Sequence, residues 1–102
     1  MPPAKLQGDG SAIARVAVAC DGGLQMLEAH LLLSQDDQSV WGMAGLGRLL
    51  CDGRSHIHSV QVRPFEGAFH RGAARASAYV LRHDPATGAT ETANASRAVR
   101  IR

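Results

Sequence analysis

Alternation along short segments is the sequence feature that most limits what this chain can fold into. Between Ser11 and Cys20 the even positions are all apolar, and Arg15 lies on the opposite face. The segments 56–63 and 73–83 have the same period of two. Because successive side chains of a strand point to opposite faces, this period predicts half-buried β-strands. The residues expected on their inner faces are Ala12, Ala14, Val16, Val18, Cys20, His56, His58, Val60, Val62, Ala74, Ala76, Ala78 and Val80.

The segment Leu24–Gln35 is compatible with two structures. Its residues favour helix by propensity, and several of its leucines are spaced as on one face of a helix. As a strand it would bury Leu27, Ala29, Leu31 and Leu33 on one face. We favour the strand, because tertiary context often overrides local propensity.

The remaining segments are separated by turn signals. Val40–Cys51 contains several glycines, which predict a strand with a bulge or a sharp bend. Pro64–Gly72 is expected to be an irregular loop, and Glu91–Arg102 the last strand. Six or seven short strands at this spacing predict an all-β fold, namely a small antiparallel sandwich of about seven strands.

Length and composition fit one small domain. The chain has 102 residues, of which 45% are hydrophobic, and this is too apolar for a disordered chain. We expect an N-terminal arm or linker at residues 1–11 and a single β-sandwich domain at 12–102. Apolar runs such as Leu31–Leu33 and Val16–Cys20 are much shorter than the roughly 18 residues of a membrane span. No membrane span is therefore expected.

Several short motifs punctuate these strands in a fixed order. A cysteine motif ends the first alternating strand, a Ser-Gln pair ends the next, and a second cysteine motif closes the glycine-rich segment. A glycine–alanine motif then opens the third alternating strand. The motifs are Cys20-Asp21-Gly22-Gly23, Ser34-Gln35-Asp36, Cys51-Asp52-Gly53-Arg54 and Gly72-Ala73-Ala74-Arg75-Ala76.

This order resembles an uncharacterised family of small secreted actinobacterial domains with an immunoglobulin-like β-sandwich, over about residues 12–102. The resemblance implies export and one inter-strand disulfide between Cys20 and Cys51, but no activity. Two buried free thiols are the alternative state of these cysteines. Residues 1–5 lack the apolar stretch of a signal peptide. The chain is therefore either a secreted or extracellular domain with a new start codon or a cytoplasmic protein, and we favour the former.

The sequence lacks the patterns that catalysis requires. No serine lies in a Gly-x-Ser-x-Gly turn, and no glycine-rich segment opens a helix as phosphate-binding loops do. The basic residues are spread along the chain without interleaved aromatic residues, so specific nucleic-acid binding is not expected. We predict a non-enzymatic binding or interaction module without a cofactor.

The first candidate binding surface is a set of arginines at expected outward positions. With Tyr79, they would form a guanidinium-rich sheet face for an acidic polymer, a cell-wall glycan or a protein. A charged face that prevents edge-to-edge association is the other interpretation. These arginines are Arg63, Arg75, Arg97, Arg100 and Arg102.

An apolar surface is the second candidate. Leu32, Trp41, Met43 and Leu50 would pack against another chain if they are exposed together. The protein would then be a subunit or adaptor. By itself we expect a monomer or a weak homodimer.

A histidine pair is the third candidate. His56 and His58 lie two residues apart on one strand face, a spacing that suits zinc or copper, with His30 or Asp52 as a third ligand. The protein would then carry a metal or a small ligand. A packed or rim position for His58 is the alternative interpretation.

Overall fold

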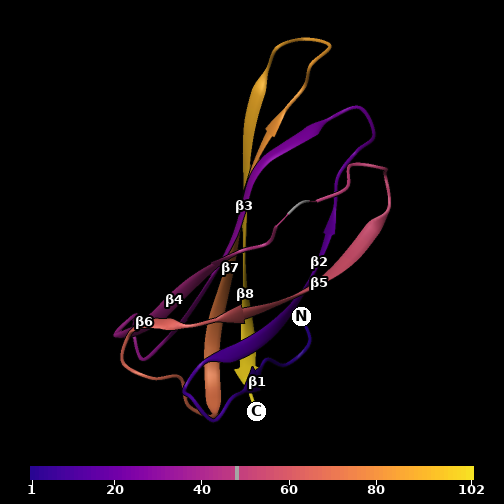
Figure 1. Ribbon diagram of the computed structural model, residues 1–102. Coiled ribbons are helices and arrows are strands. Elements are labelled where there is room, and N and C mark those ends of the chain that lie inside the picture. The colour runs from indigo at the N-terminus through magenta and orange to yellow at the C-terminus, as the bar shows by residue number, and fades with distance from the viewer. Residues whose placement is uncertain (48) are drawn as a thin grey trace.

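The chain folds into strands and connecting loops. The computed structural model describes residues 1–47 and 49–102, and within them eight β-strands and no helix occur (Figure 1). The predicted all-β fold is confirmed, and the ambiguous segment is a strand rather than a helix. The strands are β1 (Lys5–Leu6), β2 (Ala12–Ala19), β3 (Gln25–Gln35), β4 (Val40–Gly45), β5 (Ser55–Val62), β6 (Pro64–Glu66), β7 (Gly72–His83) and β8 (Thr90–Ile101).

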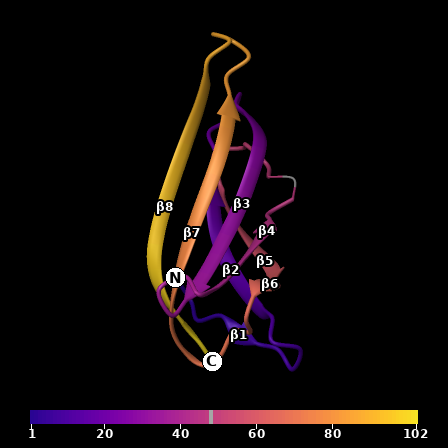
Figure 2. The same ribbon diagram turned by 90° about the vertical axis from the view of Figure 1, so that its left-hand side faces the viewer.

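The strands form two sheets, which we call the small sheet and the large sheet. The small sheet has the order β1-β2-β5, and the large sheet has the order β6-β4-β3-β7-β8. All pairs of neighbouring strands are antiparallel. Figure 2 shows β8, β7 and β3 of the large sheet side by side. The predicted antiparallel sandwich is therefore confirmed, with eight strands instead of about seven.

Small side chains from the inner faces of both sheets form the core. Ala14 of β2 and Val62 of β5 belong to one buried cluster with Leu31 and Leu33 of β3. Ala76 of β7 belongs to the same cluster. The inner faces predicted from the alternation of β2, β5 and β7 match this burial.

The N-terminal segment joins the two sheets at one end of the sandwich. Lys5–Leu6 pairs with β2, while Ala4 pairs in parallel with Ile101 of β8. Three backbone hydrogen bonds hold it there: Ala4 N–H to the Arg100 carbonyl at 2.9 Å, Arg102 N–H to the Ala4 carbonyl at 2.9 Å, and Leu6 N–H to the Arg102 carbonyl at 2.8 Å. Ala4 is buried. Part of the segment expected as an arm or linker thus contributes to both sheet edges.

The chain crosses from the small sheet to the large sheet between β5 and β6. Pro64 of β6 lies opposite Gly42 of β4. A Cβ atom on Gly42 would overlap the carbonyl oxygen of Arg63, so this approach requires glycine. The segment 64–72 was expected to be an irregular loop, and its first three residues form β6 instead. Proline is tolerated there because β6 is an edge strand.

A β-bulge in β3 changes which residues are buried at its start. The pairing with β7 shifts register between Met26 and Glu28. Because the extra residue exchanges the two faces of the strand, Met26 packs against the core and Leu27 is 52% exposed. The prediction that Leu27 faces inward is wrong for this reason.

The glycine-rich segment forms a strand only as far as Gly45. Leu46 then turns into the core, where its N–H donates to the Ala29 carbonyl at 2.9 Å, and Gly47 has a φ of 75°. Arg48, which the predicted strand included, lies outside the described residues. Cys51 lies in the connection before β5. The prediction that Cys51 ends a strand is therefore wrong.

Gln35 is a buried polar residue that fixes the loop before β7. Its Nε2 donates to the carbonyls of His70 at 2.8 Å and Ala73 at 3.2 Å. Its Oε1 accepts from the His70 N–H at 2.9 Å. A buried amide is stable only with such partners. Gln35 therefore ties the end of β3 to the start of β7.

Candidate functional site

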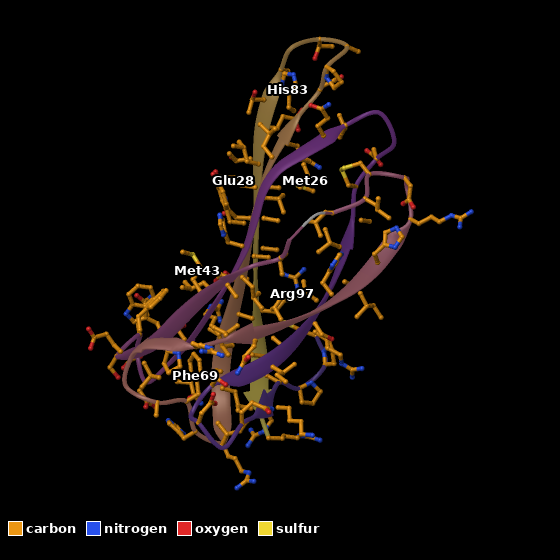
Figure 3. All side chains as sticks on the ribbon, viewed as in Figure 1. Met26, Glu28, Met43, Phe69, His83 and Arg97 are labelled. Carbon is orange, nitrogen blue, oxygen red and sulfur yellow. A yellow bond between two sulfur atoms is a disulfide. The ribbon has the colours of Figure 1, made fainter. Side chains whose placement is uncertain are left out.

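The structure separates the arginines that were expected to form one face. Arg75 of β7 and Arg100 of β8 lie on the outer face of the large sheet, opposite Ala98 and Ala73 respectively. Arg97 lies opposite the buried Ala76, and paired residues point to the same side of a sheet. It therefore points toward the small sheet, and Figure 3 shows it on the opposite side of the large sheet from Met43 and Glu28.

Arg63 is also separate from this pair, because it lies where the chain crosses from β5 to β6, and β4 and β3 lie between β6 and β7. Tyr79 remains on the outer face of the large sheet, in the same strand as Arg75 and with the same parity. Of the predicted set, Arg75 and Arg100 are diagonal neighbours on this face, Tyr79 lies four residues along β7 from Arg75, and Arg102 follows the end of β8.

The outer face of the large sheet brings the predicted apolar residues together. Across the sheet, Trp41 of β4 lies opposite Ser34 of β3, which lies opposite Arg75 of β7. In the next row, Met43 lies opposite Leu32. Leu50, which was grouped with them, belongs to the connection after β4 and is not part of this sheet.

Two aromatic pairs complete this face. The rings of Trp41 and Phe65 meet edge to face, with centroids 4.9 Å apart, and Phe65 is 60% exposed. The rings of His30 and Tyr79 are stacked, with centroids 6.4 Å apart. Sequence reasoning missed Phe65, because the strand that carries it was expected to be a loop. The aromatic face is defined here as His30, Leu32, Trp41, Met43, Phe65, Arg75 and Tyr79.

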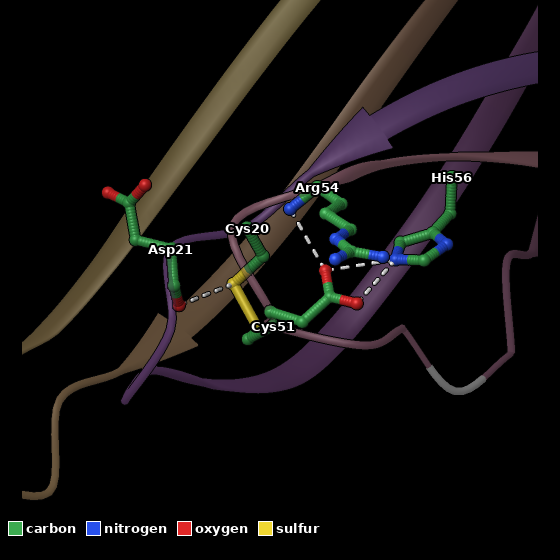
Figure 4. Close-up of a disulfide and its surroundings, with 6 residues drawn as sticks. Cys20, Asp21, Cys51, Arg54 and His56 are labelled. Atoms are coloured by element: carbon green, nitrogen blue, oxygen red, sulfur yellow. Dashed lines mark hydrogen bonds and ion pairs between the residues drawn. A yellow bond between two sulfur atoms is a disulfide. The ribbon is translucent and has the colours of Figure 1, made fainter.

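His56 makes its polar contact with Asp52, and dashed lines from the His56 ring mark this contact in Figure 4. The Nε2 atom of His56 lies 3.0 Å from each carboxylate oxygen of Asp52, and the N–H of Arg54 donates to the same carboxylate at 2.9 Å. The hydrogen bond from Arg54, followed by that from His56, lowers the pKa of the Asp52 carboxyl. This pair caps the turn that opens β5.

The other histidines considered as metal ligands lie elsewhere. His58 is two residues further along β5, half-buried on the same face as His56. His30 stacks on Tyr79 in the large sheet and cannot complete a site with them. Across residues 1–47 and 49–102, no three His, Cys, Asp or Glu side chains are grouped as metal ligands would be.

The Cys20–Cys51 disulfide lies at the same turn, between the end of β2 and the start of β5 (Figure 4). The two Cα atoms are 4.4 Å apart, and Cys20 is buried directly after β2. The N–H of Gly53 donates to the Cys20 carbonyl at 2.8 Å. The bridge therefore fastens the last residues of β2 to the turn before its partner β5, and the predicted disulfide is confirmed.

His70 and Asp36 form an exposed ion pair beside the loop that Gln35 holds in place before β7. Nε2 of His70 is 2.9 Å from Oδ2 of Asp36, and Nδ1 donates to the Arg71 carbonyl at 3.0 Å. The bond to Asp36, followed by that to Arg71, raises the pKa of His70. The stabilisation of the fold by this ion pair is thus fully present below the unfolded-state pKa of about 6.5. It is lost as pH rises through the higher folded-state pKa of His70.

We expect NMR titration of the His70 ring to have its midpoint above about 6.5 in the wild type. The midpoint should fall in Asp36→Asn, because the anionic acceptor is removed. Asp37→Asn, at the neighbouring position, is the control and should leave the midpoint in place. An equal midpoint in the wild type and Asp36→Asn would contradict this assignment.

Comparison of the chain with protein-family models, with characterised proteins and with solved structures gave no match. Within the described ranges, no helix has the length and apolar character needed to cross a membrane. The functional interpretation therefore follows from the two exposed features of the sandwich itself, its outer faces and its strand edges.

Proposed function

We propose that this protein is a non-enzymatic extracellular interaction module that binds another protein surface through its aromatic face. One observation carries the proposal: Trp41, Phe65, Tyr79 and Arg75 lie together on the outer face of one sheet. Trp, Tyr and Arg are the residues that contribute most binding energy in protein interfaces. Met43 and Phe65 on this face are 45% and 60% exposed, and exposed apolar residues grouped on one face of a small domain indicate an interaction site.

A second copy of the chain is the partner that best fits the charges on this face. Glu28 lies opposite Leu81 at one end of the face, and Arg75 lies opposite Ser34 at the other. The Glu28 side chain is 56% exposed. A two-fold axis across the strands would place Arg75 of each copy near Glu28 of the other, with the apolar residues between them. The face is thus self-complementary.

The disulfide supports the extracellular part of the proposal. Disulfides form and persist in oxidising compartments and are rare in reducing ones. The Cys20–Cys51 bridge joins the only two cysteines of the chain. The motif order that resembles small secreted domains supports the same location.

Sedimentation equilibrium over a range of concentrations tests the dimer. We expect the wild type to self-associate and Phe65→Arg to weaken the association by about tenfold or more, since it buries an unpaired charge in the interface. Ile57→Arg is the matched control, because Ile57 is 72% exposed on the small sheet. A wild type that stays monomeric at all concentrations, or an equal effect of both substitutions, overturns the proposal.

A charge exchange sharpens the same test. Glu28→Arg and Arg75→Glu should each weaken the dimer, because each places like charges opposite one another. The double variant should restore the association, since it exchanges the signs without changing the geometry. Failure of the double variant to recover would exclude the two-fold arrangement described above.

A further inference from the structure

An apolar groove opens between the two sheets, away from the aromatic face. It has a volume of about 430 Å³ and lies between β2 and β8. Val16 and Val18 of β2 line one side, and Ala93 and Ala95 of β8 line the other. Ala78 and Val80 of β7 lie on its inner surface. Because these side chains are small, the groove between the two sheets stays open here.

Unpaired strand edges border this groove on both sides. Beyond Ile13, β2 pairs with β5 alone, and before Arg100, β8 pairs with β7 alone within the described residues. Each edge therefore presents backbone N–H and C=O groups without strand partners. Such edges are templates for the addition of another strand.

The N-terminal segment already lies as a strand at one end of this groove. It runs antiparallel to β2 and parallel to β8, and it bonds to both at Ala4–Leu6. Pro2 and Pro3 precede it, and proline has no N–H to donate. The internal pairing therefore ends at Ala4, and Met1 and Pro2 lie at the entrance of the open part. The N-terminal segment therefore shows how a further strand would pair in the groove, antiparallel to β2 and parallel to β8.

The positive charge of the residues that line the groove favours an acidic strand over a basic one. Arg15 and Arg97 line it, and no Asp or Glu occurs among the described residues that line it. A carboxylate on the outward face of an incoming strand would pair with the Arg15 guanidinium. Arg97 lines the groove on the same face of β8 as Ala95 and adds to its positive charge.

We propose that this groove binds an extended acidic peptide segment of a partner protein as an added β-strand, antiparallel to β2 and parallel to β8. Its alternate apolar side chains fill the groove between Val18 and Ala95, and its carboxylates, on the opposite face of the added strand, lie beside Arg15. The groove and the aromatic face are separate surfaces, so this peptide site stands or falls independently of the dimer.

Fluorescence anisotropy with synthetic peptides tests the proposal. The probe is a labelled peptide of about seven residues in which valine and glutamate alternate, long enough to follow the groove at 3.3 Å per residue. A valine–lysine peptide of the same length is the charge control. A valine–glutamate peptide with N-methylated backbone amides is the pairing control. We expect the acidic peptide to bind at least about tenfold more tightly than either control.

Two variants locate the site. Ala95→Trp fills the groove and should weaken binding of the acidic peptide by about tenfold, whereas Ala98→Trp, on the outer face of the same strand, should not. Arg15→Glu, at an exposed position, should reverse the preference between the acidic and basic peptides. Equal affinity for both peptides, tolerance of the methylated backbone, no effect of Ala95→Trp, or no binding at all overturns the proposal.

Discussion

Gly42→Ala is expected to destabilise the sandwich by about 3 kcal/mol, because the new methyl group would overlap the Arg63 carbonyl oxygen. The overlap is with backbone, which cannot rotate away, at the point where the chain crosses between the sheets. β6 would have to separate from β4, and the pairing opposite Gly42 would be lost. Urea unfolding followed by circular dichroism measures the change.

Gly45→Ala in the same strand is the matched control. A Cβ atom there meets no other atom within 4 Å, and Gly45 does not have a positive φ. We expect the free energy of unfolding to stay constant or to rise slightly, since alanine restricts the unfolded chain. Equal destabilisation by both substitutions would show that the close approach of Arg63 to Gly42 is not responsible.

Removal of the disulfide by Cys20→Ala/Cys51→Ala is expected to cost about 3–4 kcal/mol of stability, because the bridge constrains a long loop of the unfolded chain. The sequence separation is 31 residues. In a domain of this size the melting temperature should fall by on the order of 15 °C or more. Differential scanning calorimetry measures the shift.

The reduced wild-type protein is the control for this experiment. It should melt close to the double alanine variant, because both lack the same cross-link. Two titratable thiols in native, air-oxidised wild-type protein would contradict the disulfide. A melting temperature unchanged by reduction would show that β2 and β5 hold together without it.

The sequence predicted the strands that have regular alternation and missed those that depend on distant contacts. The alternation of β2, β5 and β7 follows from burial of one face, which is a local signal. The bulge at Leu27 was not predictable, because the segment contains apolar residues on both parities and the register is set by β7. β6 is only three residues long and exists because it pairs with β4.

The same distinction applies to the candidate surfaces. Leu32, Trp41 and Met43 were grouped correctly, because they lie on adjacent strands of one hairpin. The prediction that Arg97 lies on the outer face is wrong. Arg97 shares the parity of the buried Val99 and Ile101 and points toward the small sheet. The position of Arg63 depends on where the chain crosses from β5 to β6, and this is a non-local property. Phe65 was missed together with its strand.

The pairing of the N-terminal segment with β8 determines how the domain responds to mechanical force. Because Ala4 and Ile101 pair in parallel, a pull on the two chain ends acts along the strands rather than across them. The three backbone hydrogen bonds at Ala4, Leu6 and Arg102 are then sheared together and do not open one after another. Forced unfolding is governed by the unfolding rate, and simultaneous rupture raises its barrier. A tethered copy would therefore withstand tension as a stiff link, although its core is small.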